Sequence, residues 1–281
     1  MYSKWQLAQK YCKYYFSSSN GKGHGTHSPF IFHFITQILG DKQHYPAYDK
    51  VENLRQQLLN DKTVLTIEDF GAGSSVSKTN QRMVSTIAKN SAKPKKFGQL
   101  LYRMVKAYQP ERILELGTSL GITTSYMALA KPEAKLVTME GAGEVASIAR
   151  KNFQALDLHT TLIKEGNFDD TLSSVVDELP TVDFSFIDGN HRREPTERYF
   201  KELLKKTHND SILIFDDIHW SREMEEAWAA IKAHPSVYCT VDLFFYWYCI
   251  FQAGIQGKTA FQYPVLAADK ELDERLRKSM P

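Results

Sequence analysis

Residues 113–121, with the sequence ILELGTSLG, decide the fold of this chain. An apolar run carrying Glu115 leads directly into a loop punctuated by Gly117 and Gly121. Loops of this kind join a buried strand to the following helix and present backbone N–H groups to a ligand. The stretch therefore predicts the first strand, turn and helix of an α/β array.

The chain downstream of this stretch repeats the same pattern. Short apolar runs read as strands, and amphipathic runs of helical length follow them: RILEL, AKLVTME, HTTLIKEG, VDFSFID and SILIFDD are the strands. Strands that alternate with helices of about 10–15 residues are typical of a parallel sheet covered on both faces. Two last runs, 236–244 and 245–253, are joined too tightly for a crossover and must be antiparallel. We expect an α/β fold with a mainly parallel, seven-stranded sheet and an antiparallel last strand.

The first 94 residues lack this alternation and predict a helical extension or lid, followed by one domain at 95–281. A second glycine loop, IEDFGAGSS at 67–75, resembles 113–121 but lacks the helix and second strand that should follow. We interpret it as an ordered loop of the extension. The turn SAKPKK at 91–96 reads as solvated, although it could also bring Lys95 or Lys96 near a cofactor carboxylate.

Composition excludes several classes of function. A formal net charge of +2 gives no support to a nucleic-acid partner. No apolar run approaches the roughly 20 residues that cross a bilayer, so we expect no membrane partner. Three cysteines without metal-site spacing indicate reduced thiols and a cytoplasmic location. The segment around His24, His27 and His33 lacks regular spacing and is interpreted as a lid or homodimer contact rather than a metal site.

The spacing of the 113–121 loop discriminates between cofactors. A dinucleotide fingerprint needs glycine at its first, third and sixth positions, which here are Gly117, Ser119 and Ile122. The two missing glycines weigh against NAD or FAD. S-adenosylmethionine carries no pyrophosphate, and this loop suffices to pass under its methionine portion. Glu115 can face its amino group, and Glu140, which ends the next strand, can take the ribose diol.

With these motifs the chain resembles the class I S-adenosylmethionine-dependent methyltransferases, which have a Rossmann-like fold. Residues 95–251 are most similar to the metal-dependent O-methyltransferases of the catechol and caffeoyl-CoA type and to related sugar O-methyltransferases. The motifs that carry this likeness are ILELGTSLG, VDFSFIDGNH and SILIFDDIHW. The resemblance implies methyl transfer to a hydroxyl. It assigns the cofactor to Glu115, Gly117, Thr118, Ser119, Gly121, Glu140, Gly141, Asn167 and Asp188.

The resemblance also implies a divalent metal held by Asp188, Asp216 and Asp217. The family usually has Asn in place of Asp217, whereas the sugar O-methyltransferases use Asp-Asp. Three carboxylates at two strand ends suit a hard cation such as Mg²⁺, which would hold and acidify the acceptor hydroxyl. Against this interpretation, Asp216 or Asp217 could simply cap the helix that begins near Ser221.

Two histidines follow the carboxylates and are candidates for the general base. His191 lies three residues after Asp188, and His219 lies just after the second carboxylate pair. We expect His191, with Asp188, to be catalytic, and His219 to be its competitor. The predicted activity is methylation of a small-molecule hydroxyl with S-adenosylmethionine and Mg²⁺. The alternatives are a metal-independent enzyme with a histidine base and a non-catalytic module that only binds the cofactor.

Overall fold

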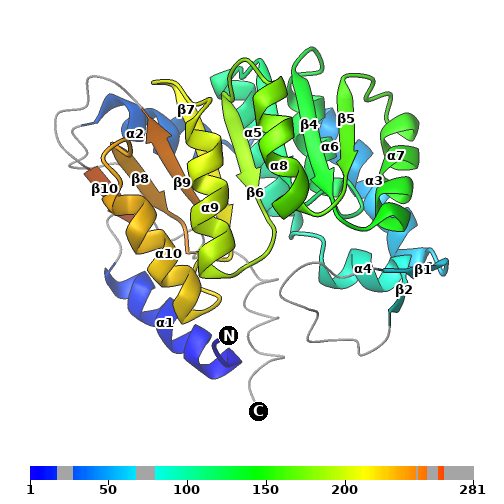
Figure 1. Ribbon diagram of the computed structural model, residues 1–281, viewed down its shortest axis with the longest axis horizontal. Helices are drawn as coiled ribbons and strands as arrows, with labels where there is room; N and C mark the ends of the chain where they lie inside the picture. Colours follow the sequence, from blue (N-terminus) through cyan, green and yellow to red (C-terminus); the bar gives the residue numbers. More distant parts are fainter. Residues whose placement is uncertain (18–27, 68–79, 245, 252–258, 263–281) are drawn as a thin grey trace.

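The computed structural model of the chain describes residues 1–17, 28–67, 80–244, 246–251 and 259–262 (Figure 1). The glycine loop at 67–75 lies outside these ranges from residue 68 onward, as do His24 and His27. None of the helices in the described part of the chain combines the length and the apolar character that a bilayer span requires.

The centre of the molecule is a twisted sheet whose strand order is β10-β8-β9-β7-β6-β3-β4-β5. Its strands are β3 (Arg112–Leu116), β4 (Lys135–Glu140), β5 (Thr161–Glu165), β6 (Phe184–Ile187), β7 (Ser211–Asp216), β8 (Cys239–Asp242), β9 (Tyr246–Phe251) and β10 (Thr259–Gln262). Neighbouring strands from β5 to β7 pair in parallel, and β9 lies antiparallel between β7 and β8. The predicted α/β fold with a mainly parallel sheet is confirmed, and the last predicted strand, β9, is antiparallel as expected.

One difference from the expected sheet is an eighth strand. β10 pairs in parallel with β8 and extends the sheet beyond the predicted seven strands. The sequence pattern gave no sign of it, because TAFQ at 259–262 is a short run without a clear alternation of apolar and polar residues.

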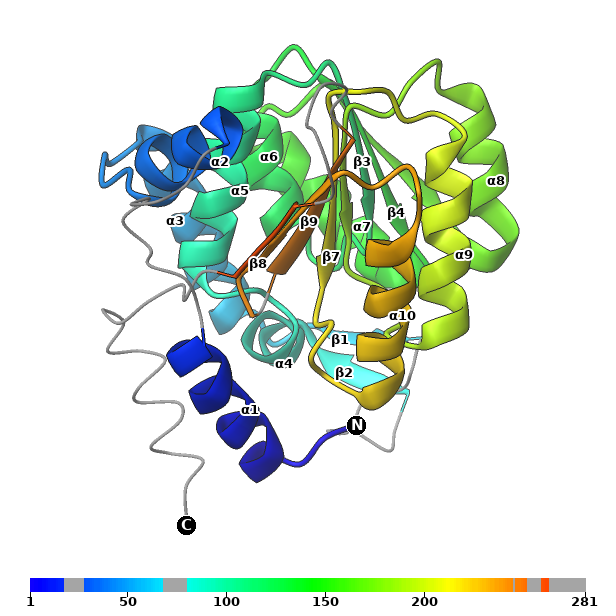
Figure 2. The ribbon, with the colours of Figure 1, turned by 90° about the vertical axis from the view of Figure 1, so that its left-hand side faces the viewer.

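Helices cover both faces of the sheet (Figures 1 and 2). The helices are α1 (Lys4–Ser17), α2 (Pro29–His33), α3 (Pro46–Asn60), α4 (Val84–Asn90), α5 (Lys95–Tyr108), α6 (Ile122–Ala130), α7 (Gly143–Ala155), α8 (Phe168–Glu178), α9 (Arg193–Leu204) and α10 (Arg222–Ala233), together with the π-helix η1 (Phe34–Leu39). Figure 2 shows α5 and α6 on one face and α8, α9 and α10 on the other.

The buried strands divide their side chains between two hydrophobic clusters because successive residues of a strand point to opposite faces. Ile113 and Phe184 pack with residues of α5, α6 and α7 in one cluster. Leu114 and Phe215 pack with residues of α8, α9 and α10 in the other. Both faces are apolar, as expected of a parallel sheet buried on both sides.

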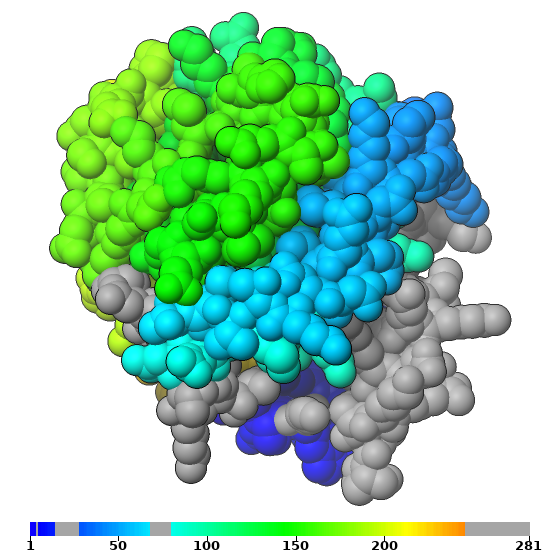
Figure 3. Space-filling view, turned by 90° about the vertical axis from the view of Figure 1, so that its right-hand side faces the viewer, coloured from blue at the N-terminus to red at the C-terminus, as the bar shows by residue number. Residues whose placement is uncertain are grey.

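In its described residues, the N-terminal extension contains helices and one short antiparallel pair, β1 (Val64–Thr66) and β2 (Gln81–Met83). Its helix α2 begins with Ser28 as N-cap and Pro29 in the first turn. α3 and α4 pack against α6 through a third apolar cluster. Thr66 N–H donates to Glu144 of α7 at 2.5 Å, and Figure 3 shows this part of the extension lying against the core. α4 therefore sits near the carboxyl ends of the strands.

Candidate active site

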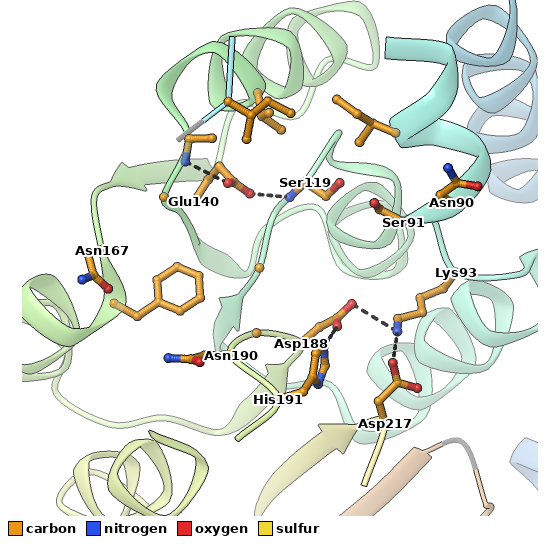
Figure 4. A pocket seen from close by; sticks show the side chains of 18 of the residues that line it. Asn90, Ser91, Lys93, Ser119, Glu140, Asn167, Asp188, Asn190, His191 and Asp217 are labelled. Atoms are coloured by element: carbon orange, nitrogen blue, oxygen red, sulfur yellow. Dashed lines mark hydrogen bonds and ion pairs between the residues drawn. The ribbon is translucent and has the colours of Figure 1, made fainter. Parts of the chain in front are cut away.

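A cavity of about 400 Å³ lies at the carboxyl ends of the strands, where the chain order in the sheet reverses between β3 and β6. Such a switch point is where open α/β sheets bind their ligands. The loops after β3, β4, β5, β6 and β7 line it, together with residues of the extension (Figure 4). The lining residues are Ile67, Arg82, Ile87, Asn90, Ser91, Lys93, Gly117, Ser119, Glu140, Gly141, Ala142, Val145, Asn167, Phe168, Asp188, Gly189, Asn190, His191, Tyr199 and Asp217.

The floor of the cavity is the contact between the ends of β3 and β6. Asp188 N–H donates to the carbonyl of Leu116 at 2.8 Å. Gly117 has φ +104°, and a Cβ atom at this position would overlap the carbonyl oxygen of Asp188. Only glycine fits such a close approach in this conformation. The first glycine of the loop therefore joins the two halves of the site.

Glu140 forms one end of the cavity. Its carboxylate accepts hydrogen bonds from the N–H groups of Ser119 at 2.8 Å and Ala142 at 3.0 Å. Burial raises the pKa of Glu140 above its ordinary value, and these backbone donors act in the opposite direction by favouring the ionised form. The carboxylate is thereby fixed at the end of β4, facing the cavity, as the sequence predicts.

The loop after β5 forms the side wall. Asn167 caps α8, with its side-chain oxygen accepting from Asp169 N–H at 3.1 Å, and the next residue, Phe168, lines the cavity. The ring of Phe168 lies so close to Gly189 that a Cβ atom there would overlap it. An aromatic ring beside an amide offers a surface for a flat, hydrogen-bonding group.

Asp188 and His191 form the opposite end of the cavity. His191 Nε2 lies 3.5 Å from Asp188 Oδ1. Burial alone would lower the pKa of His191, but the bond to Asp188 and the charge of Asp217 raise it above its ordinary value. Burial likewise opposes ionisation of Asp188, yet the charges of Lys93 and His191 outweigh it and hold the Asp188 pKa below its usual range. The two groups therefore form an imidazole–carboxylate pair.

Lys93 lies between Asp188 and Asp217 at this end (Figure 4), and Asp216 is its third carboxylate neighbour. Its ammonium donates to Asp216 and lies 3.5 Å from Asp188 Oδ2 and 3.6 Å from Asp217 Oδ2. Burial, together with the adjacent charge of Asp217, raises the pKa of Asp216. Asp188, Asp216 and Asp217 are called the acidic trio below.

The oxygen ligands of the acidic trio favour a divalent metal, but the position of Lys93 among them opposes one. Oxygen ligands from carboxylates suit a hard divalent cation, and candidate ligand atoms of Asp188, His191 and Asp216 lie within 4.8 Å of one another. However, the ammonium of Lys93 contacts the oxygens that such an ion would need. With the lysine in this position the trio does not fit a divalent metal.

Comparisons with known proteins agree with this architecture. Residues 114–218 match the family model described as "Methyltransferase domain". The catechol O-methyltransferase of Niastella koreensis is 31% identical over 124 residues, which cover 43% of this chain and 55% of that protein. The catechol O-methyltransferase of Mycobacterium tuberculosis is 26% identical over 127 residues, covering 43% and 54%. The chain thus spans about half the length of the curated relatives that it matches.

Solved structures extend the likeness to most of the chain. An O-methyltransferase from Bacillus cereus, in complex with SAH, is 18% identical with a TM-score of 0.51, covering 79% of this chain and 97% of that one. The O-methyltransferase TomG from Streptomyces achromogenes, in complex with SAM, has a TM-score of 0.55 at 15% identity, covering 75% and 92%. Residues 114–218 of this chain therefore resemble a methyltransferase domain, and the chain has the Rossmann-like fold of the class I methyltransferases. The predicted resemblance and fold are confirmed.

Several residues predicted to bind the methyltransferase cofactor lie away from the cavity wall. Glu115 is fully buried, and its carboxyl group accepts from the hydroxyl groups of Thr124 and Thr138. Burial raises the Glu115 pKa to about 8, although the two threonines act against it. Thr118 shares a 2.6 Å hydrogen bond with Thr138, and Gly121 packs on Phe153. Glu115 is a mid-strand residue, so its side chain points into the protein rather than toward the crevice.

The second histidine also lies away from the cavity lining. His219 Nδ1 contacts Glu225 at 2.9 Å, and its ring stacks on Phe244 with the ring centroids 4.7 Å apart. Glu225 in turn pairs with Lys10 of α1. Of the two predicted bases, only His191 lines the cavity. The helix-capping alternative for Asp216 and Asp217 does not apply, because Ser221 itself caps α10.

The N-terminal extension contributes to the cavity several residues that the sequence did not single out. Arg82, Asn90 and Ser91 line the cavity from β2 and the end of α4. Lys93 comes from the SAKPKK turn, where the sequence suggested Lys95 or Lys96 instead. The sequence offered one signal for Lys93, its position directly before the proline that starts a helix. Choosing it over Lys95 and Lys96 required the fold.

Proposed function

We propose that this protein transfers a methyl group from S-adenosylmethionine to a hydroxyl group of a small molecule. One observation carries the proposal: a single cavity joins an amide-bound carboxylate, Glu140, to an imidazole–carboxylate pair, His191 and Asp188, across the switch point of a methyltransferase sheet. The two curated relatives are named catechol O-methyltransferases. A catechol or simple phenol is therefore the first acceptor class to test.

The cofactor is proposed to lie across the loop after β3. Glu140 would accept hydrogen bonds from the ribose hydroxyls, because its carboxylate ends the strand next to β3 and faces the cavity. The adenine would lie against Phe168, near Asn167. The methionine portion would follow Gly117 and Ser119, where the absence of a large side chain leaves room for close approach to the backbone. This arrangement points the sulfonium toward Asp188.

The acceptor hydroxyl is proposed to bind between the sulfonium and His191. A neutral His191 takes the hydroxyl proton on Nδ1, the ring nitrogen that does not face Asp188. The acceptor oxygen then forms a bond to the methyl carbon while the carbon–sulfur bond breaks, and the cofactor leaves as neutral S-adenosylhomocysteine. Asp188 stabilises the imidazolium that results, as a carboxylate partner does in other histidine bases. Positioning of the reactants supplies most of the remaining acceleration.

Metal assistance was the first prediction from the sequence, and it stays a prediction. The position of Lys93 within the acidic trio supports the metal-independent alternative, in which a histidine acts as base. No step of the proposed reaction is therefore routed through a metal. The homodimer and the cytoplasmic location also stay predictions.

Calorimetry with S-adenosylhomocysteine tests the cofactor half of this proposal. The wild-type chain should bind it, and Glu140→Gln should bind it about 10–100-fold more weakly, since a hydrogen-bonded charge is lost. Glu144→Gln, at the start of α7, is the matched control and should bind like wild type, because Glu144 contacts the extension instead. Equal affinity of wild type and Glu140→Gln would contradict the assignment.

Measurement of turnover tests the second half of the proposal, the transfer of the methyl group to an acceptor. Wild-type protein, S-adenosylmethionine and a panel of catechols and phenols should give methylated product, detected by mass spectrometry. Intact S-adenosylhomocysteine binding without product from any acceptor would favour the non-catalytic module over the enzyme.

A further inference from the structure

We propose that Lys93 is a built-in cation that takes the position of a divalent metal in this site and excludes the metal from it. This inference goes beyond the proposed methyl transfer, because it concerns which cation the acidic trio holds. The observation behind it is the convergence of three carboxylates on one ammonium. Asp216 accepts a hydrogen bond from Lys93, and Asp188 and Asp217 lie at 3.5 and 3.6 Å.

The surroundings of the trio demand a counter-charge. Asp216 is only 2% exposed, and the side chains of Asp188 and Lys93 are 18% and 17% exposed. Carboxylates this buried are rarely left unpaired, since the lost hydration must be replaced by an opposite charge or by hydrogen bonds. Lys93 supplies that charge from within the chain. His191, 3.5 Å from Asp188, also faces the trio and adds a positive charge when it is protonated.

The backbone around Lys93 fixes where its side chain starts. Pro94 follows it as the N-cap of α5, and the carbonyl of Pro94 accepts from Phe97 N–H at 3.0 Å. The residue before a proline is restricted to extended conformations. α5 is itself anchored at Gly98, where a Cβ atom would overlap the ring of Tyr126. The lysine therefore leaves a rigid point at the carboxyl edge of the sheet, and its reach ends among the carboxylates.

An ammonium and a divalent ion cannot share this position. Mg²⁺ requires oxygens at about 2.0–2.1 Å in near-octahedral geometry, whereas an ammonium donates hydrogen bonds to the same oxygens over longer distances. Two cations in contact would also repel each other strongly in a partly buried site. Of the candidate ligands, Asp216 is bonded to Lys93 and Asp188 lies between Lys93 and His191. Binding of a metal would require the lysine to leave.

This arrangement predicts that removing the lysine charge uncovers a metal site. The test uses Mn²⁺ as the probe, followed by electron paramagnetic resonance, on the full chain without cofactor. Lys93→Met keeps the length of the side chain but not the charge, and it should bind Mn²⁺ at least about 100-fold more tightly than wild type, which is the effect of a unit charge at this range. Lys95→Met, an exposed lysine in the same turn, is the matched control and should bind like wild type.

Two further variants test whether the gained Mn²⁺ binding occurs at the acidic trio and depends on the charge of Lys93. Asp188→Asn introduced into Lys93→Met should abolish the gained Mn²⁺ binding, because Asp188 is one of the oxygens exposed by the change. Lys93→Arg keeps the positive charge and should stay as weak as wild type. Wild-type turnover, where an acceptor has been found, should be unchanged after treatment with a chelator.

The wild-type protein alone can overturn the proposal, even if Lys93→Met fails to fold. Wild-type binding of Mn²⁺ that is lost in Asp188→Asn would show that the lysine does not exclude the ion. A Lys93→Met variant that folds, as judged by circular dichroism, and binds no more tightly than Lys95→Met would overturn it as well. Neither result depends on turnover. Failure of the proposed methyl transfer would appear separately, as missing S-adenosylhomocysteine binding or missing product.

Discussion

The two ends of the cavity are built in different ways. At the cofactor end, one carboxylate, Glu140, is held by backbone N–H groups of the loops after β3 and β4. At the acceptor end, charged side chains hold one another, and they come from three segments far apart in the sequence: Lys93, 188–191 and 216–217. The first end depends on local chain geometry, and the second depends on the tertiary fold.

This difference affects the electrostatics of each end. Backbone donors do not titrate, so the two hydrogen bonds that hold Glu140 do not depend on the ionisation of other side chains. The acceptor end contains mutually dependent charges. The same lysine helps to lower the pKa of Asp188, while burial and Asp217 raise that of Asp216. A single substitution there should therefore alter several neighbours, whereas one at the cofactor end should act locally.

The sharpest way to separate the two ends is to remove the base. His191→Gln should lower kcat by about 100- to 10,000-fold, the usual contribution of a positioned general base. Its affinity for S-adenosylhomocysteine should stay close to wild type, because His191 lies at the opposite end from Glu140. Steady-state kinetics and calorimetry on one preparation give both numbers. His219→Gln is the control, since His219 contacts Glu225 rather than the cavity, and a loss of kcat equal to that of His191→Gln would refute the assignment.

A second prediction concerns the acid behind the cofactor end. Folding raises the pKa of Glu115 from about 4.5 to about 8, so the folded protein binds its proton more tightly than the unfolded chain. Its contribution to the free energy of unfolding is therefore full below pH 4.5 and falls as the pH rises toward 8. Between pH 5 and pH 9, wild type should lose on the order of 4 kcal/mol relative to Glu115→Gln.

Urea denaturation at several pH values measures this difference. Other buried groups also titrate in this range, so the quantity to follow is wild type minus variant rather than wild type alone. Glu111→Gln, whose side chain is exposed, should give a constant difference over the same range. A constant difference for Glu115→Gln would mean that Glu115 has the same pKa in the folded and unfolded chains.

The smallest expected effect tests the junction between the two ends. Gly117→Ala should lower the free energy of unfolding by roughly 2 kcal/mol, because φ +104° is unfavourable for alanine and its Cβ meets the carbonyl of Asp188. It should weaken S-adenosylhomocysteine binding and lower kcat together, since both ends share this contact. Gly143→Ala, where a Cβ would meet only the end of the Glu165 side chain, is the control. Gly117→Ala with unchanged stability would show that the junction yields easily.

The two ends also differed in how well the sequence predicted them. Glu140 and Asp188 both line the cavity, because an acid that ends a strand of a parallel array must lie at its carboxyl edge. Glu115 was placed incorrectly at the cofactor, because its strand continues beyond it to Leu116 and the alternation of side chains turns it inward. The position of Glu115 one residue before the end of its strand, rather than at the end, makes it a buried acid instead of a cavity-lining one.

By itself, the sequence determined the alternation of strands and helices from β3 onward and the acids at the ends of β4 and β6, because alternating apolar patterns and glycine turns are local properties of the chain. Only the tertiary structure decided that Lys93 reaches the acidic trio, that His191 rather than His219 faces the cavity, and that Glu115 is buried. The reason is physical: charge neutralisation and burial depend on which distant segments pack together, and no periodicity in the sequence records those distances.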